Sequence, residues 1–248
     1  MSGAAGRSAG AAGDGDGDVL EDMETPSEVL AVAFGGIAMS VGGIPPFEFF
    51  RVLNDTAPAK KLLLRDSSQS WYHRGVEGMA GDVAGVAAAI RRIVEREQPR
   101  KLVTLGASAG GYAALLFGRL LGAEEVHAFG PQTFIGPGLR LRHLDHRWGR
   151  LWTSLMLSGR YQPRYGDLYR VFKRTPSPGS RVVVHYCDSD RFDDAHARRL
   201  GRHPDVELRR YDEGGHFIVK HLRDSGRLQP LLRELLSVSD AGGAAVEQ

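Results

Sequence analysis

The 248-residue chain has 42% hydrophobic and 25% charged residues, a composition typical of a globular protein and not of a disordered chain or a membrane protein. Its apolar runs are too short to span a bilayer and its start lacks a secretory signal pattern, so we expect a cytoplasmic protein without stable membrane insertion. Cys187 is the only cysteine, which excludes an internal disulfide.

Residues 1–27 are rich in Gly, Ala and Asp and hold few large apolar side chains. Such a segment buries too little apolar surface to offset the entropy lost on ordering, so we expect a disordered tail here and a second one at 241–248. Residues 1–28 carry a net charge of −6, which leaves +8 on the rest of the chain. The body of the protein is therefore basic.

From residue 29 onward, short runs of Val, Leu and Ile alternate with segments of helical periodicity. This pattern predicts an α/β fold with a mainly parallel sheet of about six strands and helices on both faces. The predicted strands are 29–34, 61–65, 101–106, 125–130, 181–186 and 205–211. Helices are predicted at 45–54, 109–121, 193–201 and 217–237, the last broken near Gly226 and Pro230. A further helix follows Asp82 as N-cap and ends before Pro99.

Residues 131–179 separate the fourth and fifth predicted strands by far more than a crossover helix requires. They carry nine Lys or Arg against Asp145 and Asp167, with seven aromatic side chains among them. We therefore expect a basic, aromatic cap insertion between core segments at 28–130 and 180–240. Its charge favours an anionic partner, although a solvated basic face is the simpler explanation.

The stretch Gly106-Ala107-Ser108-Ala109-Gly110 matches G-x-S-x-G, the pattern of a nucleophile elbow, with a predicted strand before it and a predicted helix after it. A serine in a strained turn needs small residues on both sides, which glycine supplies. Its hydroxyl then lies at a helix N-terminus, where developing negative charge is favoured. We predict Ser108 as a nucleophile, and the alternative is an ordinary strand-to-helix turn.

A serine nucleophile needs a base that is itself oriented by an acid. His216, in the glycine-rich stretch YDEGGHF after the last predicted strand, is the candidate base. The acid is expected after the fifth predicted strand, where Asp190 is preferred for its distance from the strand end and Asp193 is the alternative. The remaining candidates, Asp188 and Asp194, are expected to cap the next helix.

Acyl chemistry also needs N–H donors aimed at an oxyanion. Candidates are Ala109, after the nucleophile, and Gly36 with Gly35 in the loop after the first predicted strand, where an ordinary tight turn is the alternative. The expected lining of an acyl pocket is Ile37, Trp71 and Tyr72, although bracing of the loop is the simpler role for the two aromatics. The histidines do not form a zinc pattern, so we expect no metal and no cofactor.

The motifs GASAG, FGG, DSD and GGHF resemble the α/β-hydrolase superfamily over residues 29–237. The resemblance implies an eight-stranded plan with a cap after strand six, which is where residues 131–179 lie. Two departures stand out. The polar start leaves no room for the first two strands of the family, and Phe34 replaces the His that often precedes the loop glycine. No named esterase family is therefore assigned.

The leading expectation is a serine hydrolase that cleaves an ester or thioester through an acyl-enzyme. The basic segment suggests a small acyl substrate joined to coenzyme A or to an acidic carrier protein. Acyl transfer or cyclisation would use the same chemistry, and a non-catalytic binding protein of this fold is a further alternative. Nucleic-acid binding is not expected, because no binding motif accompanies the basic residues. The oligomeric state is left open.

Overall fold

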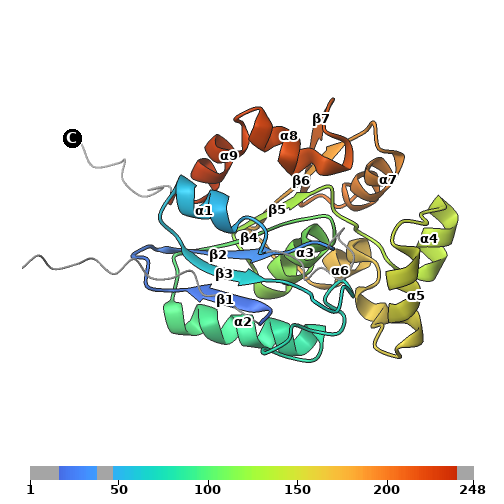
Figure 1. The fold of residues 1–248 in the computed structure, drawn as a ribbon, viewed down its shortest axis with the longest axis horizontal. Helices are drawn as coiled ribbons and strands as arrows, with labels where there is room; N and C mark the ends of the chain where they lie inside the picture. Colours follow the sequence, from blue (N-terminus) through green and yellow to red (C-terminus); the bar gives the residue numbers. More distant parts are fainter. Residues whose placement is uncertain (1–16, 38–46, 239–248) are drawn as a thin grey trace, which may run out of the picture.

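The computed structural model describes residues 17–37 and 47–238 and is built around a seven-stranded sheet (Figure 1). The strand order is β1-β3-β2-β4-β5-β6-β7, and all neighbours are parallel except β1 and β3. The strands are β1 (Val19–Asp22), β2 (Val29–Phe34), β3 (Lys60–Leu64), β4 (Lys101–Ala107), β5 (Glu125–Phe129), β6 (Arg181–Cys187) and β7 (Val206–Tyr211). The predicted α/β class is confirmed, and β1 is added to the six predicted strands.

Strand β1 corrects the expectation that all of residues 1–27 are disordered. It runs antiparallel to β3 at the edge of the sheet, with Val19 opposite Leu64. Its acidic residues act as anchors, since Asp22 pairs with Lys61 at 2.7 Å. A strand this short has too few apolar residues to be recognised from sequence. Residues 1–16 and 239–248, including the tail predicted at 241–248, lie outside the described residues.

The core helices flank the sheet on both faces. They are α1 (Phe50–Thr56), α2 (Val83–Glu97), α3 (Ala109–Leu121), α7 (Arg191–Leu200), α8 (Ile218–Asp224) and α9 (Leu228–Leu235). Asp82 caps α2 as predicted, because its side chain accepts a hydrogen bond from the N–H of Gly85. Positions 45 and 46 of the predicted first helix lie outside the described residues. Within residues 17–37 and 47–238, the structure has no helix of the length and apolar character needed to cross a membrane.

Alternating side chains of the strands build one core on each face of the sheet. Leu30 and Val32 of β2 pack with α2 and α3, whereas Val29 and Ala31 pack with α1, α8 and α9. Both faces are apolar, as expected for a parallel sheet covered by helices on each side. Figure 1 shows α8, α9 and α1 on one side of the strands and α2 on the other.

The long segment between β5 and β6 divides into two parts. It contains α4 (Pro137–His143), α5 (Gly149–Leu157), the 3₁₀ turn η1 (Pro163–Tyr165) and α6 (Leu168–Arg174). Helix α6 belongs to the core, because Leu168 and Phe172 are buried in the cluster that surrounds α3. Helices α4 and α5 lie apart at one end of the molecule (Figure 1). Helix α5 nevertheless contacts the core, because Leu155 is buried in the same cluster, so the segment is not a cap separate from the core.

Candidate active site

Ser108 lies at the turn between β4 and α3 in a strained backbone conformation, with φ of 54° and ψ of −117°. The flanking glycines make this turn possible. A Cβ on Gly106 would lie 2.2 Å from the carbonyl oxygen of Gly110, and one on Gly110 would lie 2.1 Å from that of Phe34. Because backbone atoms cause both clashes, no side chain could be accommodated at either position. The predicted steric reason for the glycines is confirmed.

His216 brings an imidazole to Ser108 from the far end of the chain. Its Nε2 lies 3.1 Å from Ser108 Oγ, and its Nδ1 lies 2.9 Å from Oδ2 of Asp193. The ring is carried by the 3₁₀ turn η2 (Gly215–Phe217), at whose start Gly214 and Gly215 both have positive φ. Three side chains from three separate elements thus meet at one end of the sheet.

The structure overturns the preference for Asp190 as the residue that contacts His216. Asp190 is the N-cap of α7, and its carboxylate accepts hydrogen bonds from the N–H groups of Phe192 and Asp193. Asp193 makes the contact instead, because α7 begins at Arg191, shortly after β6 ends at Cys187, and its first turn carries this side chain toward His216. Asp188 and Asp194 pair with surface arginines, Arg210 and Arg198.

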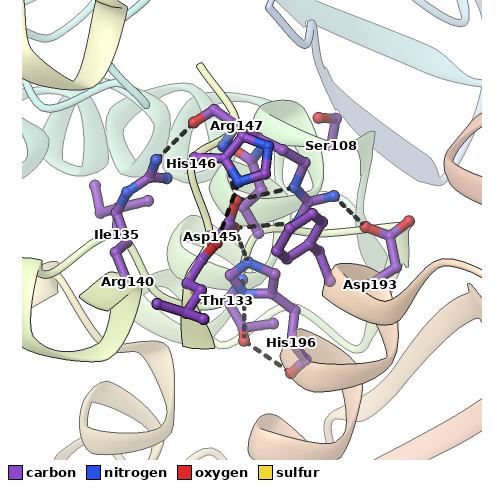
Figure 2. A network of polar contacts seen from close by, with 12 residues as sticks. Ser108, Thr133, Ile135, Arg140, Asp145, His146, Arg147, Asp193 and His196 are labelled. Atoms are coloured by element: carbon purple, nitrogen blue, oxygen red, sulfur yellow. Dashed lines mark hydrogen bonds and ion pairs between the residues drawn. The ribbon is translucent and has the colours of Figure 1, made fainter. Parts of the chain in front are cut away.

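Asp193 is also held by an arginine that sequence reasoning missed. Nη1 of Arg147, in the loop between α4 and α5, donates to Oδ1 of Asp193 at 2.7 Å, as Figure 2 shows. Burial raises the pKa of the Asp193 carboxyl, but His216 and Arg147 outweigh burial and bring this pKa below its usual value. No local pattern singles out Arg147 among the nine basic residues of its segment.

The candidate oxyanion donors have different surroundings. Ala109 begins α3, so its N–H has no carbonyl partner within the helix. Gly36 lies beside Glu48, and its N–H favours the charged form of the Glu48 carboxyl group and so lowers its pKa. The N–H of Gly35 donates to the carbonyl oxygen of Leu64 at 2.8 Å, inside the sheet. Gly35 is therefore wrong as a donor, which leaves Ala109 and Gly36.

Glu48 is a second residue that sequence reasoning missed. It lines the same cavity as Ser108 and His216, and no motif surrounds it in the sequence. Burial raises the pKa of Glu48 to about 7, although the Gly36 N–H and the attraction of His216 oppose the shift. Its carboxyl group therefore changes charge near neutral pH, directly beside a candidate oxyanion donor.

A cavity of about 270 Å³ opens beside Ser108. Ile37 lines it as predicted, together with Phe49, Trp148 and Phe217, so part of its wall is apolar. Lys220 and Arg223 add positive charge, although both lie near Asp224. The cavity suits an apolar acyl group joined to a polar or charged remainder.

Trp71 and Tyr72 do not line this cavity. Both side chains are fully buried in the core. The Tyr72 hydroxyl donates to the carbonyl oxygen of Gly35 at 2.9 Å, and the Trp71 indole N–H donates to Gln132. These aromatics brace the loops beneath the site, as the simpler sequence interpretation held, and their assignment to an acyl pocket is wrong.

The donor atoms of Asp190, Asp193 and His216 lie within 4.8 Å of one another, a spacing that also suits a metal ion. Hydrogen bonds explain this proximity. Asp190 caps α7, and Asp193 is shared by His216 and Arg147. The Arg147 guanidinium, 2.7 Å from Asp193, would repel a metal cation bound here, so we assign no metal to the cluster.

No family model and no curated protein matches the chain. Solved structures do. A capsule O-acetyltransferase of Neisseria meningitidis serogroup A is 16% identical with a TM-score of 0.64, covering 84% of this chain and 88% of its own. An α/β serine hydrolase without a lid from Xanthomonas campestris is 17% identical with a TM-score of 0.51, covering 89% and 90%.

Brefeldin A esterase, a bacterial homologue of human hormone-sensitive lipase, is 19% identical with a TM-score of 0.53, covering 85% of this chain and 67% of its own. Likenesses at such low identity establish architecture and not activity. They agree with the mainly parallel sheet and the helices that flank it. The chain therefore has the α/β-hydrolase fold.

Proposed function

We propose that the protein is a serine hydrolase that cleaves an ester or thioester through an acyl-enzyme intermediate. The observation that carries the proposal is the continuous hydrogen-bond path from Ser108 Oγ to His216 and on to Asp193. In such a path the serine attacks the carbonyl carbon, the imidazole takes its proton, and the carboxylate holds the imidazole in the required orientation.

In the proposed reaction, attack by Ser108 forms a tetrahedral intermediate, and His216 then passes the proton to the departing alcohol or thiol. Water attacks the resulting acyl-serine, gives a proton to His216, and releases the acid as the proton returns to Ser108. The N–H groups of Ala109 and Gly36 stabilise the oxyanion in both steps.

Acyl transfer is the second candidate, in which an alcohol replaces water in the second step. The likeness to a capsule O-acetyltransferase favours it, and so does Trp148, which the segment between β5 and β6 contributes to the cavity wall. Lys220 and Arg223 support an acyl donor that carries negative charge, such as an acyl-coenzyme A.

Labelling with a fluorophosphonate probe tests the proposal. We expect the wild-type protein to be labelled and Ser108→Ala to remain unlabelled. Equal labelling of both proteins, or silence of a folded wild-type protein, would reject it. Turnover of p-nitrophenyl acetate and acetyl-coenzyme A, with and without an added alcohol, then separates hydrolysis from transfer, since transfer yields a new ester.

A further inference from the structure

Arg147 joins two buried carboxylates at the candidate active site. Its Nε and Nη2 each donate to Asp145 at 3.2 Å, while Nη1 donates to Asp193 at 2.7 Å (Figure 2). The arginine side chain is 15% exposed, and those of the two aspartates are 1% and 0% exposed. The planar guanidinium thus uses one edge for Asp145 and its remaining nitrogen for Asp193, a geometry that lysine cannot reproduce.

Asp145 is in turn fixed by His196 of α7. The N–H of Thr133 donates to Nδ1 of His196, so the ring proton lies on Nε2, which donates to Asp145 Oδ2 at 3.0 Å. Burial lowers the pKa of His196 to about 4, even though Asp145 opposes the shift. His196 therefore stays neutral at physiological pH, and Asp145 keeps its charge for Arg147.

Arg147 contacts the same carboxylate of Asp193 that holds His216. Oδ1 of Asp193 receives Arg147 Nη1 and also lies 3.1 Å from His216 Nδ1, with Oδ2 at 2.9 Å. A donor anchored at its other edge fixes the plane of this carboxylate and offsets part of its negative charge. Both effects reach the imidazole that contacts Ser108.

We propose that Arg147 is a positioning residue, through which the loop between α4 and α5 orients Asp193 and keeps it ionised for His216. This inference rests on the proposed function. It places part of the machinery on the loop between α4 and α5, which also contributes Trp148 to the cavity beside Ser108.

The ionisable groups around the Asp193–His216 pair come from several elements. Asp193 faces Arg147 from the α4–α5 loop, with Asp190 at the start of α7 and His196 one turn further along α7 close by. Asp145 lies against Arg147, and His216 faces Glu48 across the cavity. Only Arg147 among the groups facing Asp193 is permanently positive. Its removal leaves the negative charges uncompensated and favours protonation of the pair.

The experiment compares pH profiles of p-nitrophenyl acetate hydrolysis for wild-type, Arg147→Gln and Arg147→Lys, after fluorophosphonate labelling has established activity at Ser108. We expect the acid limb of kcat/KM in Arg147→Gln to move up by about one pH unit, and its kcat to fall about tenfold with little change in KM. Arg147→Lys restores the position of the limb but only part of kcat, because the charge remains and the fork is lost.

Arg150→Gln is the matched control, since Arg150 is an exposed arginine three residues further along the same segment. We expect its pH profile to coincide with that of the wild type. If Arg147→Gln also coincides with the wild type while labelling is intact, the inference is wrong and the proposed function survives. If the folded wild type is never labelled, the proposed function itself fails.

Asp145→Asn provides a second variant should Arg147→Gln not fold. It removes the negative charge of Asp145, so the positive charge of Arg147 stabilises ionised Asp193 more strongly. The acid limb of kcat/KM therefore moves to lower pH, opposite to its shift in Arg147→Gln. Loosened anchoring of the fork lowers kcat at the same time. An upward shift of the limb, or an unchanged kcat, would contradict the proposed role of the loop.

Discussion

Two regions meet at Ser108, and they are organised in different ways. The elbow, residues 106–110, is shaped by backbone contacts between residues that are close in sequence or in adjacent strands. The acid junction, where the α4–α5 loop meets α7, is held by polar side chains between residues 46 to 51 positions apart. Local sterics therefore create the nucleophile, whereas long-range polar contacts orient the groups that would activate it.

Replacing each of the two aspartates at the start of α7 by a neutral residue gives the strongest test of the contrast between the elbow and the acid junction. We expect Asp193→Asn to lower kcat by about 10⁴-fold, as loss of the orienting carboxylate does in serine hydrolases. Asp190→Asn should change kcat far less, since asparagine also caps helices. Initial rates with p-nitrophenyl acetate measure both. Similar losses in the two variants would show that Asp193 has no special role.

The steric requirement for glycine at the elbow is tested by adding one methyl group at Gly106. Gly106→Ala places a Cβ 2.2 Å from a carbonyl oxygen, so we expect a loss of several kcal/mol in unfolding free energy or a failure to fold. Gly138→Ala in α4 is the control, because a Cβ there meets nothing within 4 Å. Urea unfolding of both variants decides the point. A Gly106→Ala protein as stable as Gly138→Ala would refute the steric account of the turn.

Glu48, in the wall of the cavity, makes the unfolding free energy of the protein depend on pH. Its pKa is raised from 4.5 to about 7, so the folded state binds this proton more tightly than the unfolded state. Stability is therefore lost as the pH rises through this window, by on the order of 3 kcal/mol at most. Glu48→Gln should remove this decline between pH 5 and pH 8, as followed by urea unfolding at each pH.

An unchanged slope in Glu48→Gln would mean that the carboxyl group is solvated and that burial does not raise its pKa. Arg51→Gln serves as the control, since Arg51 is exposed on α1 close by in sequence. Its pH dependence of stability should match that of the wild type.

The smallest expected effect concerns the cap of α7. Asp190→Ala removes the acceptor for two N–H groups at the start of the helix. We expect it to lower the unfolding free energy by about 1 kcal/mol. Thermal unfolding monitored by circular dichroism measures this loss. A much larger loss would mean that Asp190 does more at the acid junction than cap a helix.

The elbow and most strands could be predicted from sequence because their signals are local. Ser108 between two glycines, a β-branched run before it and an alanine-rich helix after it all lie within one short stretch. His216 was also accessible, because it follows the last strand in a glycine-rich turn.

The acid could not be chosen in the same way. Four aspartates follow β6, and which of them faces His216 depends on where α7 begins, a boundary that sequence patterns fix poorly. Helix α7 starts at Arg191, so Asp190 became its cap and Asp193 turned inward.

Arg147, Glu48 and β1 were missed for a different reason. Each depends on partners distant in sequence: Arg147 on Asp193, Glu48 on Gly36, and β1 on β3. Single-sequence periodicity carries no information about such pairings. Charge counting even misdirected the interpretation. Acidic residues assigned to a tail anchor an edge strand, and an arginine assigned to a basic surface lies largely enclosed between two carboxylates.

The most direct test of the central claim is to trap the acyl group on the protein. Acid quenching during turnover of p-nitrophenyl acetate, followed by peptide mapping by mass spectrometry, shows which residue is acetylated. We expect the acetyl group on the peptide that contains Ser108, and its loss in Ser108→Ala. Turnover that continues while this peptide stays unmodified, or an acetyl group on another residue, would contradict the account.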